Sequence, residues 1–185
     1  MTAPTRVTIE RELDDAGIAA WWPVYEAAFT PLATRAAARH LLSREEFAEE
    51  MADSRIMKLL AWDLDGNAVA MTTIATDLDA VAWISPDFYR SRYADAQERD
   101  ALWYVGYTLA HPTVRGTSAF ADMIDVMFDL LTTNDVTVGY DVSRFNDLSL
   151  KFAEHMVGRA RLVAEVDSAE VDVQTYYTAT FSAKS

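Results

Sequence analysis

The sequence predicts an α/β fold: a central mixed β-sheet, mostly antiparallel, with one parallel and splayed strand pair and with helices on both sides. One observation is a strand-like run at residues 102 to 110, a helical pattern at 118 to 132 and a second strand at 136 to 143. A strand–helix–strand unit of this length indicates a parallel pair with a right-handed crossover. The other is an Asp65-Gly66 turn between two apolar runs, which is typical of an antiparallel hairpin.

The first part of the chain predicts one strand followed by two or three short helices. Residues 7 to 13 alternate like a strand, and Asp14-Asp15 supply an N-cap for the helical pattern that follows. Thr30-Pro31 marks a break between helices, because proline is tolerated at the first position of a helix and not inside it. Ser43 to Glu46 forms a capping box for another helix reaching about Asp53. The acidic residues Glu45, Glu46, Glu49 and Glu50 are expected to form the exposed face of that helix.

Three further strands and another helix complete the expected order around the crossover unit. Residues 56 to 63 and 68 to 76 read as the strands of the hairpin, and residues 77 to 99 as a long loop-like segment able to carry short helices. Asn146 is expected to cap a helix ending near Gly158, and residues 161 to 166 and 171 to 181 to form two final strands. The length favours a single domain over residues 1 to 185.

Composition excludes several classes of function. The chain has no cysteine, which removes disulfides, thiolate nucleophiles and cysteine-based zinc sites, and its three histidines lack metal-ligand spacing, so no metal is expected. The net charge of −13 disfavours nucleic acid and anionic membranes as partners and suits a cationic amine. No apolar run is long enough to span a membrane, and the first residues do not resemble a signal peptide, so a cytoplasmic protein is expected.

The segment Ala110-His111-Pro112-Thr113-Val114-Arg115-Gly116 joins a strand to a helix. The amides of a first helical turn, at the positive end of the helix dipole, can hold a phosphate or pyrophosphate. The order Ala-x-Pro-x-x-Arg-Gly resembles the cofactor loop of the GCN5-related N-acetyltransferase (GNAT) superfamily, in which Val-x-Pro-x-x-Arg-Gly is usual. The expected order of strands and helices also resembles that fold over nearly the whole chain.

The resemblance implies an N-acyltransferase that uses acetyl-CoA or another acyl-CoA as co-substrate. The thioester arm would enter between the two parallel strands, where Leu109 and Ala110 offer backbone groups and Asn146 lies near the far end of the arm. A neutral amine would attack the thioester carbonyl directly, with a strand N–H meeting the developing charge. The pyrophosphate would be cradled by the amides of Arg115, Gly116, Thr117, Ser118, Ala119 and Phe120.

The sequence departs from the family pattern at two kinds of position. Ser118 and Phe120 stand where the family has its second and third motif glycines. Gly106 and Tyr107 occupy the strand positions where many members carry an acidic base, and Ala153 or Glu154 the position of the usual tyrosine acid. We therefore expect a water-relayed proton transfer, with the catalytic candidates being Tyr104, Tyr107 and His111. The alternatives are aromatic packing for the tyrosines, expected on opposite strand faces, and a structural role for the histidine.

Two groups of aromatic and basic residues are candidates for binding the acceptor. Trp22 and Phe29 could line a pocket between the early helices and the sheet, or belong to the core. Trp83, Tyr89, Arg90 and Arg92 could hold a carboxylate-bearing substrate, although the arginines could equally pair with the chain's own carboxylates. The expected partner is a small-molecule amine, with a peptide amine and a homodimer left open.

Two other functions remain open at this stage. One is a degenerate member of the fold that binds a ligand without transferring an acyl group. The other is transfer from an acyl carrier protein, which would dock on a basic patch such as Arg35, Arg39 and Arg44, or Arg90, Arg92 and Arg99.

The motif generates one prediction about coenzyme A binding. A β-branched side chain at Gly116 should strain the loop, so Gly116→Val is expected to weaken binding by about 1–3 kcal/mol. Calorimetry with desulfo-coenzyme A measures this difference. Binding as tight as that of the parent would show that this loop is not the site.

Overall fold

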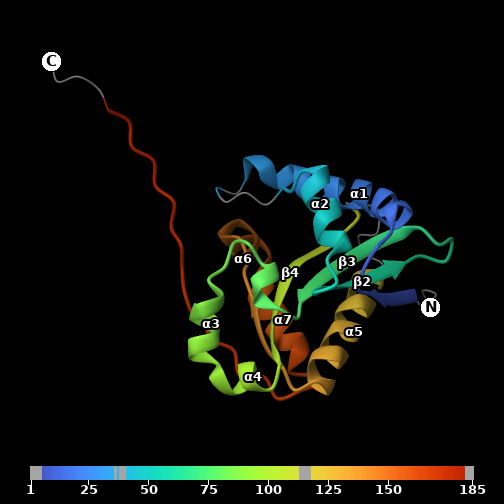
Figure 1. Ribbon diagram of the computed structural model, residues 1–185. Helices are drawn as coiled ribbons and strands as arrows, with labels where there is room; N and C mark the ends of the chain where they lie inside the picture. The colour runs from blue at the N-terminus through green and yellow to red at the C-terminus, as the bar shows by residue number, and fades with distance from the viewer. Residues whose placement is uncertain (1–5, 36, 38–40, 113–117, 182–185) are drawn as a thin grey trace.

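The computed structural model describes residues 6–35, 37, 41–112 and 118–181 (Figure 1). These residues form a five-stranded sheet, in the order β1-β2-β3-β4-β5, with helices around it. The elements are β1 Arg6–Glu10, α1 Asp15–Phe29, the 3-10 helix η1 Thr30–Thr34, α2 Arg44–Ala52, β2 Ile56–Trp62, β3 Ala68–Ala75, η2 Leu78–Ala80, α3 Pro86–Arg92, α4 Ala94–Glu98, β4 Leu102–Ala110, α5 Ala119–Thr133, β5 Thr137–Tyr140, α6 Arg144–Leu150 and α7 Phe152–Ala160.

The predicted mixed sheet is confirmed. Strands β1 to β4 pair antiparallel in sequence order, and β5 pairs parallel to β4 from Leu102 opposite Thr137 to Val105 opposite Tyr140. Helix α5 makes the crossover between these two strands, as the strand–helix–strand pattern requires. The second strand is shorter than the predicted range 136 to 143, because β5 ends at Tyr140.

The local start signals of α1, α2 and the hairpin are also confirmed. Asp14 caps α1, its Oδ1 accepting from the Gly17 N–H at 2.8 Å. At α2 the Ser43 N–H donates to Glu46 Oε2 at 2.7 Å while Ser43 Oγ accepts from the Glu46 N–H at 3.2 Å, which is a complete capping box. Gly66 has φ +82° in the turn between β2 and β3, a conformation that favours glycine.

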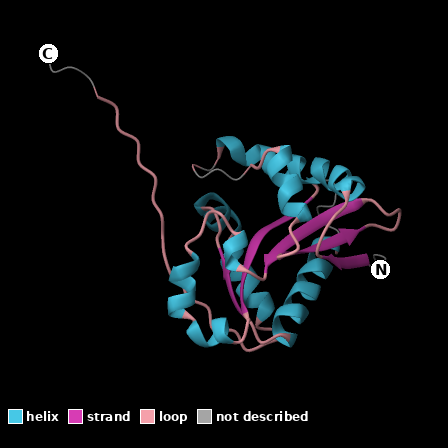
Figure 2. Cartoon of the chain, in the orientation of Figure 1, coloured by secondary structure: helices cyan, strands magenta, loops and turns pink. Residues whose placement is uncertain are grey.

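Apolar side chains cover both faces of the sheet. Helices α5 and α7 pack on one face, where Met123 and Ile124 of α5 are buried with Leu59 of β2. Helices α1 and α2 pack on the other, where Trp21 and Phe47 are fully buried. Figure 2 shows the sheet between these two groups of helices. Burying one such large side chain contributes about 1.5–3 kcal/mol, so both faces help to fix the strand order.

A β-bulge in β4 corrects the expectation that Tyr104 and Tyr107 lie on opposite faces. Thr72 pairs with Thr108 and Ile74 with Val105, so Thr73 alone stands opposite two residues of β4. The extra residue reverses the alternation of side chains beyond it. Tyr104 therefore packs with residues of η2 and α4, and Tyr107 with residues of α1 and α2, on the same face of the sheet.

The C-terminal part differs most from the sequence prediction. The two strands expected at 161 to 166 and 171 to 181 are absent: residues 161 to 164 form turns, and residues 165 to 181 have no regular structure. The helix expected from Asn146 to Gly158 is two helices, separated at Lys151, whose φ is +48°. Ser143, and not Asn146, is the N-cap of α6, because its Oγ accepts from the Asn146 N–H. Gly158 lies inside α7 instead of ending it.

The segment 77 to 99 carries short helices, η2, α3 and α4, as long connections often do. Within the part of the chain that the structure describes, no helix is both long and apolar enough to cross a membrane.

Two glycines generate a matched prediction about stability. A Cβ at Gly139 of β5 would lie 2.7 Å from Cδ2 of Tyr104 and 2.9 Å from Cε1 of Tyr89, whereas a Cβ at Gly158 would meet nothing within 4 Å. Gly139→Ala is expected to lower the free energy of unfolding by about 1–3 kcal/mol through overpacking. Gly158→Ala should raise it by roughly 0.5–1 kcal/mol, because alanine is the better helix former. Urea denaturation of both variants measures the contrast, and equal effects would contradict the packing at Gly139.

Candidate functional site

The site begins where β4 and β5 part. Their parallel pairing ends at Val105 and Tyr140, while β4 continues to Ala110 and stays paired with β3 on its other edge. In the described residues no strand pairs with the β5-side edge of β4 from Gly106 to Ala110. Such an edge presents backbone N–H and C=O groups that can bind an extended ligand.

The bulge residue Gly106 lies at the start of this free edge. A Cβ there would lie 2.6 Å from Thr73 Oγ1 and 3.8 Å from Cη2 of Trp83. Thr73 Oγ1 also accepts a hydrogen bond from the Tyr107 N–H at 3.2 Å. The threonine therefore holds the bulge in place, and only glycine fits beside it.

An exposed carboxylate stands at the end of β5, beside this edge. Asp141 Oδ1 accepts from Tyr104 Oη at 2.7 Å and from Trp83 Nε1 at 3.1 Å. Tyr104 is buried, whereas the Trp83 side chain is 51% exposed. Two donors from different elements thus orient one oxygen of the carboxylate. Asp141 was missed as a site residue because it falls inside the predicted strand 136 to 143; its position directly after the paired part of that strand is the only signal.

The phenol of Tyr104 is a hydrogen-bond donor in this arrangement. Burial raises its pKa far above the ordinary value, and the neighbouring negative charge of Asp141 raises it further. The rings of Tyr89 and Trp83 contact Tyr104 edge-on, with centroids at 5.7 and 6.4 Å. The structure therefore brings three predicted site residues, Trp83, Tyr89 and Tyr104, together around Asp141.

Tyr107 lies on the α1 side of the same region. Its ring packs edge-on against Tyr25 and Phe29, with centroids at 5.2 and 5.6 Å. The hydroxyl is buried and has no hydrogen-bond partner in the described structure. Burial raises the pKa of this phenol well above its ordinary value, and the charge of Glu50 adds to the effect. The group is therefore protonated at neutral pH and cannot accept a proton.

Close to Tyr107 lies a polar pair, the buried Lys58 and the partly buried Glu50, that the sequence did not indicate. Lys58 of β2 is fully buried, and its Nζ donates to the backbone oxygens of Arg11 and Asp53, both at 2.8 Å. Burial lowers the pKa of Lys58 to about 8 and raises that of the Glu50 carboxyl to about 7, although each charge opposes the shift of the other. The expectation that Glu50 lies on an exposed helix face is wrong, because α2 turns this side chain toward the sheet.

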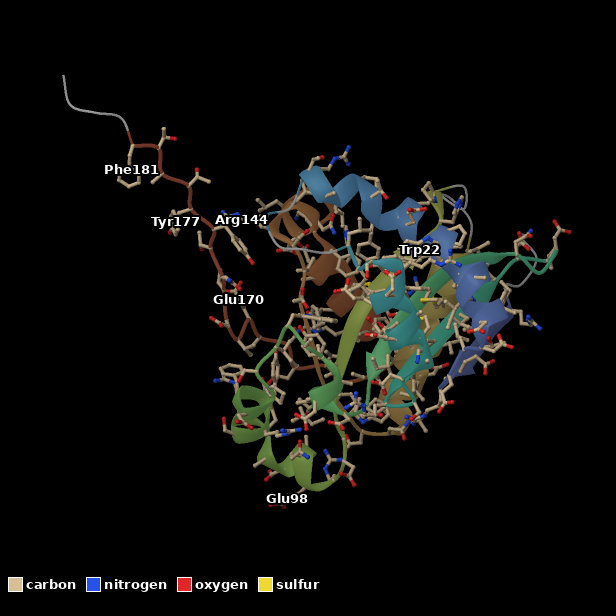
Figure 3. The ribbon with its side chains drawn as sticks, turned by 45° about the horizontal axis from the view of Figure 1, so that its top comes forward. Trp22, Glu98, Arg144, Glu170, Tyr177 and Phe181 are labelled. Atoms are coloured by element: carbon tan, nitrogen blue, oxygen red, sulfur yellow. The ribbon has the colours of Figure 1, made fainter. Side chains whose placement is uncertain are left out.

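The other residues that were predicted to bind the acceptor, Trp22, Arg90 and Arg92, do not lie together. Trp22, which is labelled in Figure 3, stacks on Tyr25 with centroids 5.8 Å apart, and Tyr25 in turn contacts Tyr107. Arg90 pairs with Asp79 at 2.9 Å, which is the alternative that the sequence left open for it. Arg92 is exposed, with its guanidinium 6.0 Å from the Tyr93 ring centroid.

Of the predicted coenzyme-binding residues that the structure describes, Leu109 and Ala110 lie on β4, Ser118, Ala119 and Phe120 lie at the start of α5, and Asn146 lies on α6. Leu109 is buried toward α1 and α2, and the His111 N–H, just beyond Ala110, donates to Val69 O at 2.8 Å. Ser118 Oγ donates to Asp122 Oδ2 at 2.9 Å. Arg115, Gly116 and Thr117 lie outside the described residues, as does Arg39 of the proposed basic patch.

Phe120 and Asn146 lie at the two ends of the predicted coenzyme site. Phe120 packs against the core cluster under α5, beside the buried Ala119, so its ring contributes to the core. Asn146 lies in the first turn of α6, on the segment that follows Asp141.

No protein-family profile and no curated protein matches this sequence. Solved structures do match. An aminoglycoside acetyltransferase from an uncultured soil metagenomic sample, in complex with sisomicin, is 13% identical, with 94% of this chain and 97% of that one covered and a TM-score of 0.54. The PaiA N-acetyltransferase from Thermoplasma acidophilum, in complex with coenzyme A, is 10% identical over 81% and 87% of the chains, with a TM-score of 0.54.

A third match is the ribosomal-protein-S18-alanine N-acetyltransferase from Escherichia coli, 13% identical over 82% of this chain and 76% of that one, with a TM-score of 0.52. At these identities the likeness shows the fold. The chain has the fold of the GCN5-related N-acetyltransferases, as the resemblance of the Pro112 loop implied.

The buried pair generates a prediction about pH. The groups that act on the Glu50 carboxyl are Lys58, Thr73 through a side-chain hydrogen bond, and Asp53, and its own charge acts on Tyr107. Because the folded-state pKa of about 7 exceeds the ordinary 4.5, the stabilising effect of the protonated carboxyl is complete below pH 4.5 and is lost as pH rises through 7. From pH 5 to pH 8 the parent should therefore lose about 1–3 kcal/mol of unfolding free energy relative to Glu50→Gln.

Urea denaturation at several pH values measures this slope. Glu49→Gln is the matched control, because Glu49 is exposed on the same helix and should keep the parent's slope. Parallel pH profiles for the parent and Glu50→Gln would contradict the assignment.

Proposed function

We propose that this protein is an N-acyltransferase that moves an acyl group, in the first instance acetyl, from coenzyme A to the primary amine of a cationic small molecule. The observation that carries the proposal is the free edge of β4, from Gly106 to Ala110, beside the oriented carboxylate of Asp141. The free edge of β4 suits an extended thioester arm, and the carboxylate of Asp141 suits an amine. They lie where the same two strands separate.

The β4 edge fits the pantetheine arm because its backbone groups have no strand partner on that side in the described residues. An acyl-CoA supplies the thioester carbonyl carbon that the amine attacks. A backbone N–H of β4 aimed at the carbonyl oxygen stabilises the negative charge that develops there. The attack forms the amide C–N bond and breaks the C–S bond, and the thiolate that leaves takes up one proton.

Asp141 is proposed to hold the acceptor's ammonium group. Its Oδ1 is occupied by Tyr104 and Trp83, which leaves Oδ2 to accept a hydrogen bond from the amine. The exposed indole of Trp83 offers a ring face that attracts a cation. A charge-assisted bond of this kind, in a chain of net charge −13, favours amines that carry several positive charges.

The amine must lose a proton before it attacks. Tyr104 and Tyr107 cannot accept it, because burial raises the pKa of both phenols. In the proposed route a water molecule takes this proton and passes it to solvent, near His111 at the end of the free edge, while Asp141 keeps the amine in place through a hydrogen bond. Tyr104 donates its one phenolic proton to Asp141 and so keeps that carboxylate in position beside the relay.

Binding without transfer is the second candidate function. It is favoured by the two protonated phenols, by the absence of a strand carboxylate at Gly106 or Tyr107, and by Asp122, whose negative charge lies in the first turn of α5. A ligand would then be held at the same edge and released unchanged.

A steady-state assay separates the two functions. Acetyl-CoA is offered with a panel of polyamines, aminoglycosides, amino-acid amides and a peptide beginning with alanine, and a thiol reagent detects released coenzyme A. The protein contributes no background because it has no cysteine. Turnover with a cationic small amine supports the proposal, and coenzyme A binding without turnover on any amine favours the binding protein.

Asp141→Asn should raise the KM for the amine roughly 10- to 100-fold, corresponding to about 1.4–2.8 kcal/mol, and leave the KM for acetyl-CoA within about twofold. The asparagine oxygen can still accept from Tyr104 and Trp83, so the variant removes charge and little else. Asp129→Asn is the control, since Asp129 is exposed on α5. An unchanged KM for the amine would rule out Asp141 as its anchor.

A further inference from the structure

A connected set of polar groups lies beside the bulge of β4, on the face of the sheet that α1 and α2 cover (Figure 1). Thr73 of β3 is at its centre and is fully buried. Its Oγ1 accepts from the Tyr107 N–H at 3.2 Å, and its side chain forms a hydrogen bond with the Glu50 carboxyl of α2. Lys58 stands directly opposite Thr73 in the register of β2 and β3. The set therefore connects α2 to the backbone of the bulge.

The direction of the two hydrogen bonds at Thr73 depends on the charge of Glu50. Beside an ionised carboxylate, which only accepts, the Thr73 hydroxyl proton points to Glu50 and the oxygen stays free for the Tyr107 N–H. Beside a protonated carboxyl, the Glu50 O–H can donate to the same oxygen and compete with that N–H. Hydrogen bonds to an ionised group are about twice as strong as neutral ones. The ionised form of Glu50 therefore gives the firmer hold on the bulge.

The pKa of Glu50 agrees with this direction. Burial raises it to about 7, and the charge of Lys58 and the hydrogen bond with Thr73 oppose that rise, while the charge of Asp53 adds to it. A hydrogen bond that favours the ionised carboxylate is itself strengthened when the carboxylate ionises, because the two equilibria are linked. Both forms of Glu50 are therefore populated near neutral pH.

The other titratable groups around Glu50 come from several elements. Tyr107 of β4, whose ring contacts Tyr25 of α1, has a pKa raised well above its ordinary value, mainly by burial, and stays protonated. Burial lowers the pKa of Lys58 of β2 to about 8, and the charges that also act on Lys58 are those of Glu50, Asp53, Glu12 and Arg11. Glu50 and Lys58 are thus the groups of this set that titrate near neutral pH.

We propose that Glu50 is a positioning residue for the free edge of β4: through Thr73 its carboxylate fixes the bulge, and so holds the edge that receives the thioester arm. The threonine contacts both residues of the bulge, because a Cβ at Gly106 would lie 2.6 Å from its Oγ1 and the Tyr107 N–H donates to the same oxygen. Glu50 acts through Thr73 and does not touch the substrate. The part of the inference that concerns the arm rests on the proposed function.

Nuclear magnetic resonance of the free protein tests the hold on the bulge. In the parent, the Tyr107 amide proton and the Glu50 carboxyl carbon should titrate together, with a midpoint near 7. Glu50→Gln should abolish the transition of the amide, and Glu49→Gln, on the exposed side of the same helix, should retain it. A Tyr107 amide that does not titrate would overturn the proposal. So would one that still titrates in Glu50→Gln, which would assign the transition to Lys58.

Hydrogen exchange at pH 8 separates a hold on the bulge from the mere effect of a nearby charge. Thr73→Val keeps the β-branched shape and removes the hydroxyl, so the Tyr107 amide should exchange at least about tenfold faster. The pKa of Glu50 should rise in this variant, because a bond that lowers it is lost. Thr73→Ser keeps the hydroxyl and should bring both values back toward those of the parent.

Equal exchange of the Tyr107 amide in the parent and in both Thr73 variants would contradict the proposal. If Thr73→Val does not fold, the comparison of the parent with Glu50→Gln at pH 8 replaces it, since Glu50→Gln resembles the protonated carboxyl. Faster exchange of the Tyr107 amide is then expected in Glu50→Gln, and an unchanged rate would contradict the proposal.

Calorimetry with desulfo-coenzyme A tests the effect on binding. The parent is compared with Glu50→Gln at pH 6 and at pH 8, so that titration of the coenzyme's own phosphate affects both proteins alike. The two affinities should agree within about twofold at pH 6, whereas the parent should bind roughly 3- to 10-fold more tightly at pH 8.

The binding result separates this inference from the proposed function. An affinity ratio that is the same at both pH values would overturn the inference and leave the proposed function standing. A lack of binding by either protein at either pH would contradict the proposed function, and with it the part of the inference that concerns the arm. The titration of the Tyr107 amide would then still decide whether Glu50 holds the bulge.

Discussion

The parallel pairing of β4 and β5 stops after Val105 and Tyr140, and the candidate site depends on where it stops. Three local contacts set this point. Gly139 leaves room for the rings of Tyr104 and Tyr89 against β5, the hydroxyl of Tyr104 binds Asp141 just after the strand, and Gly106 starts the bulge in β4. The opening therefore follows from side-chain packing on one face of the sheet.

The polar groups around this opening have contrasting environments. Asp141 is exposed and oriented by two donors, which suits the binding of a cation. Tyr107 and Lys58 lie deeper, where burial disfavours their charged forms. A buried lysine and a partly buried glutamate cost desolvation energy that a purely apolar core would avoid. The charge of Glu50 acts on Tyr107, so polar groups lie close to the aromatic residues on this side of the sheet.

Signals confined to a few adjacent residues were sufficient to predict much of the fold. The capping box at Ser43, the glycine turn at Gly66 and the crossover through α5 are each encoded locally, and each is confirmed. The bulge at Gly106 could not be predicted, because it depends on the register of β4 against Thr73. The burial of Glu50 was missed for a similar reason, since helical spacing alone does not say which face meets the sheet.

The C-terminal segment, in contrast, has a local residue pattern that predicted a strand, but it forms no strand in the structure. A strand also needs an edge to pair with, and the sequence does not say where that edge is. The sequence placed Trp83 and Tyr89 with Arg90 and Arg92, and Tyr104 with Tyr107, whereas the structure brings Trp83, Tyr89 and Tyr104 together around Asp141. Asp141, which joins them, has no local signature beyond its place after β5.

Hydrogen exchange of the backbone amides, with and without desulfo-coenzyme A, tests the central claim most directly. If the free edge of β4 holds the thioester arm, amides within residues 106 to 110 should exchange more slowly when the ligand is bound, while those of β2, which is paired on both edges, stay unchanged. Protection elsewhere, with residues 106 to 110 unaffected at saturating ligand, would contradict the account.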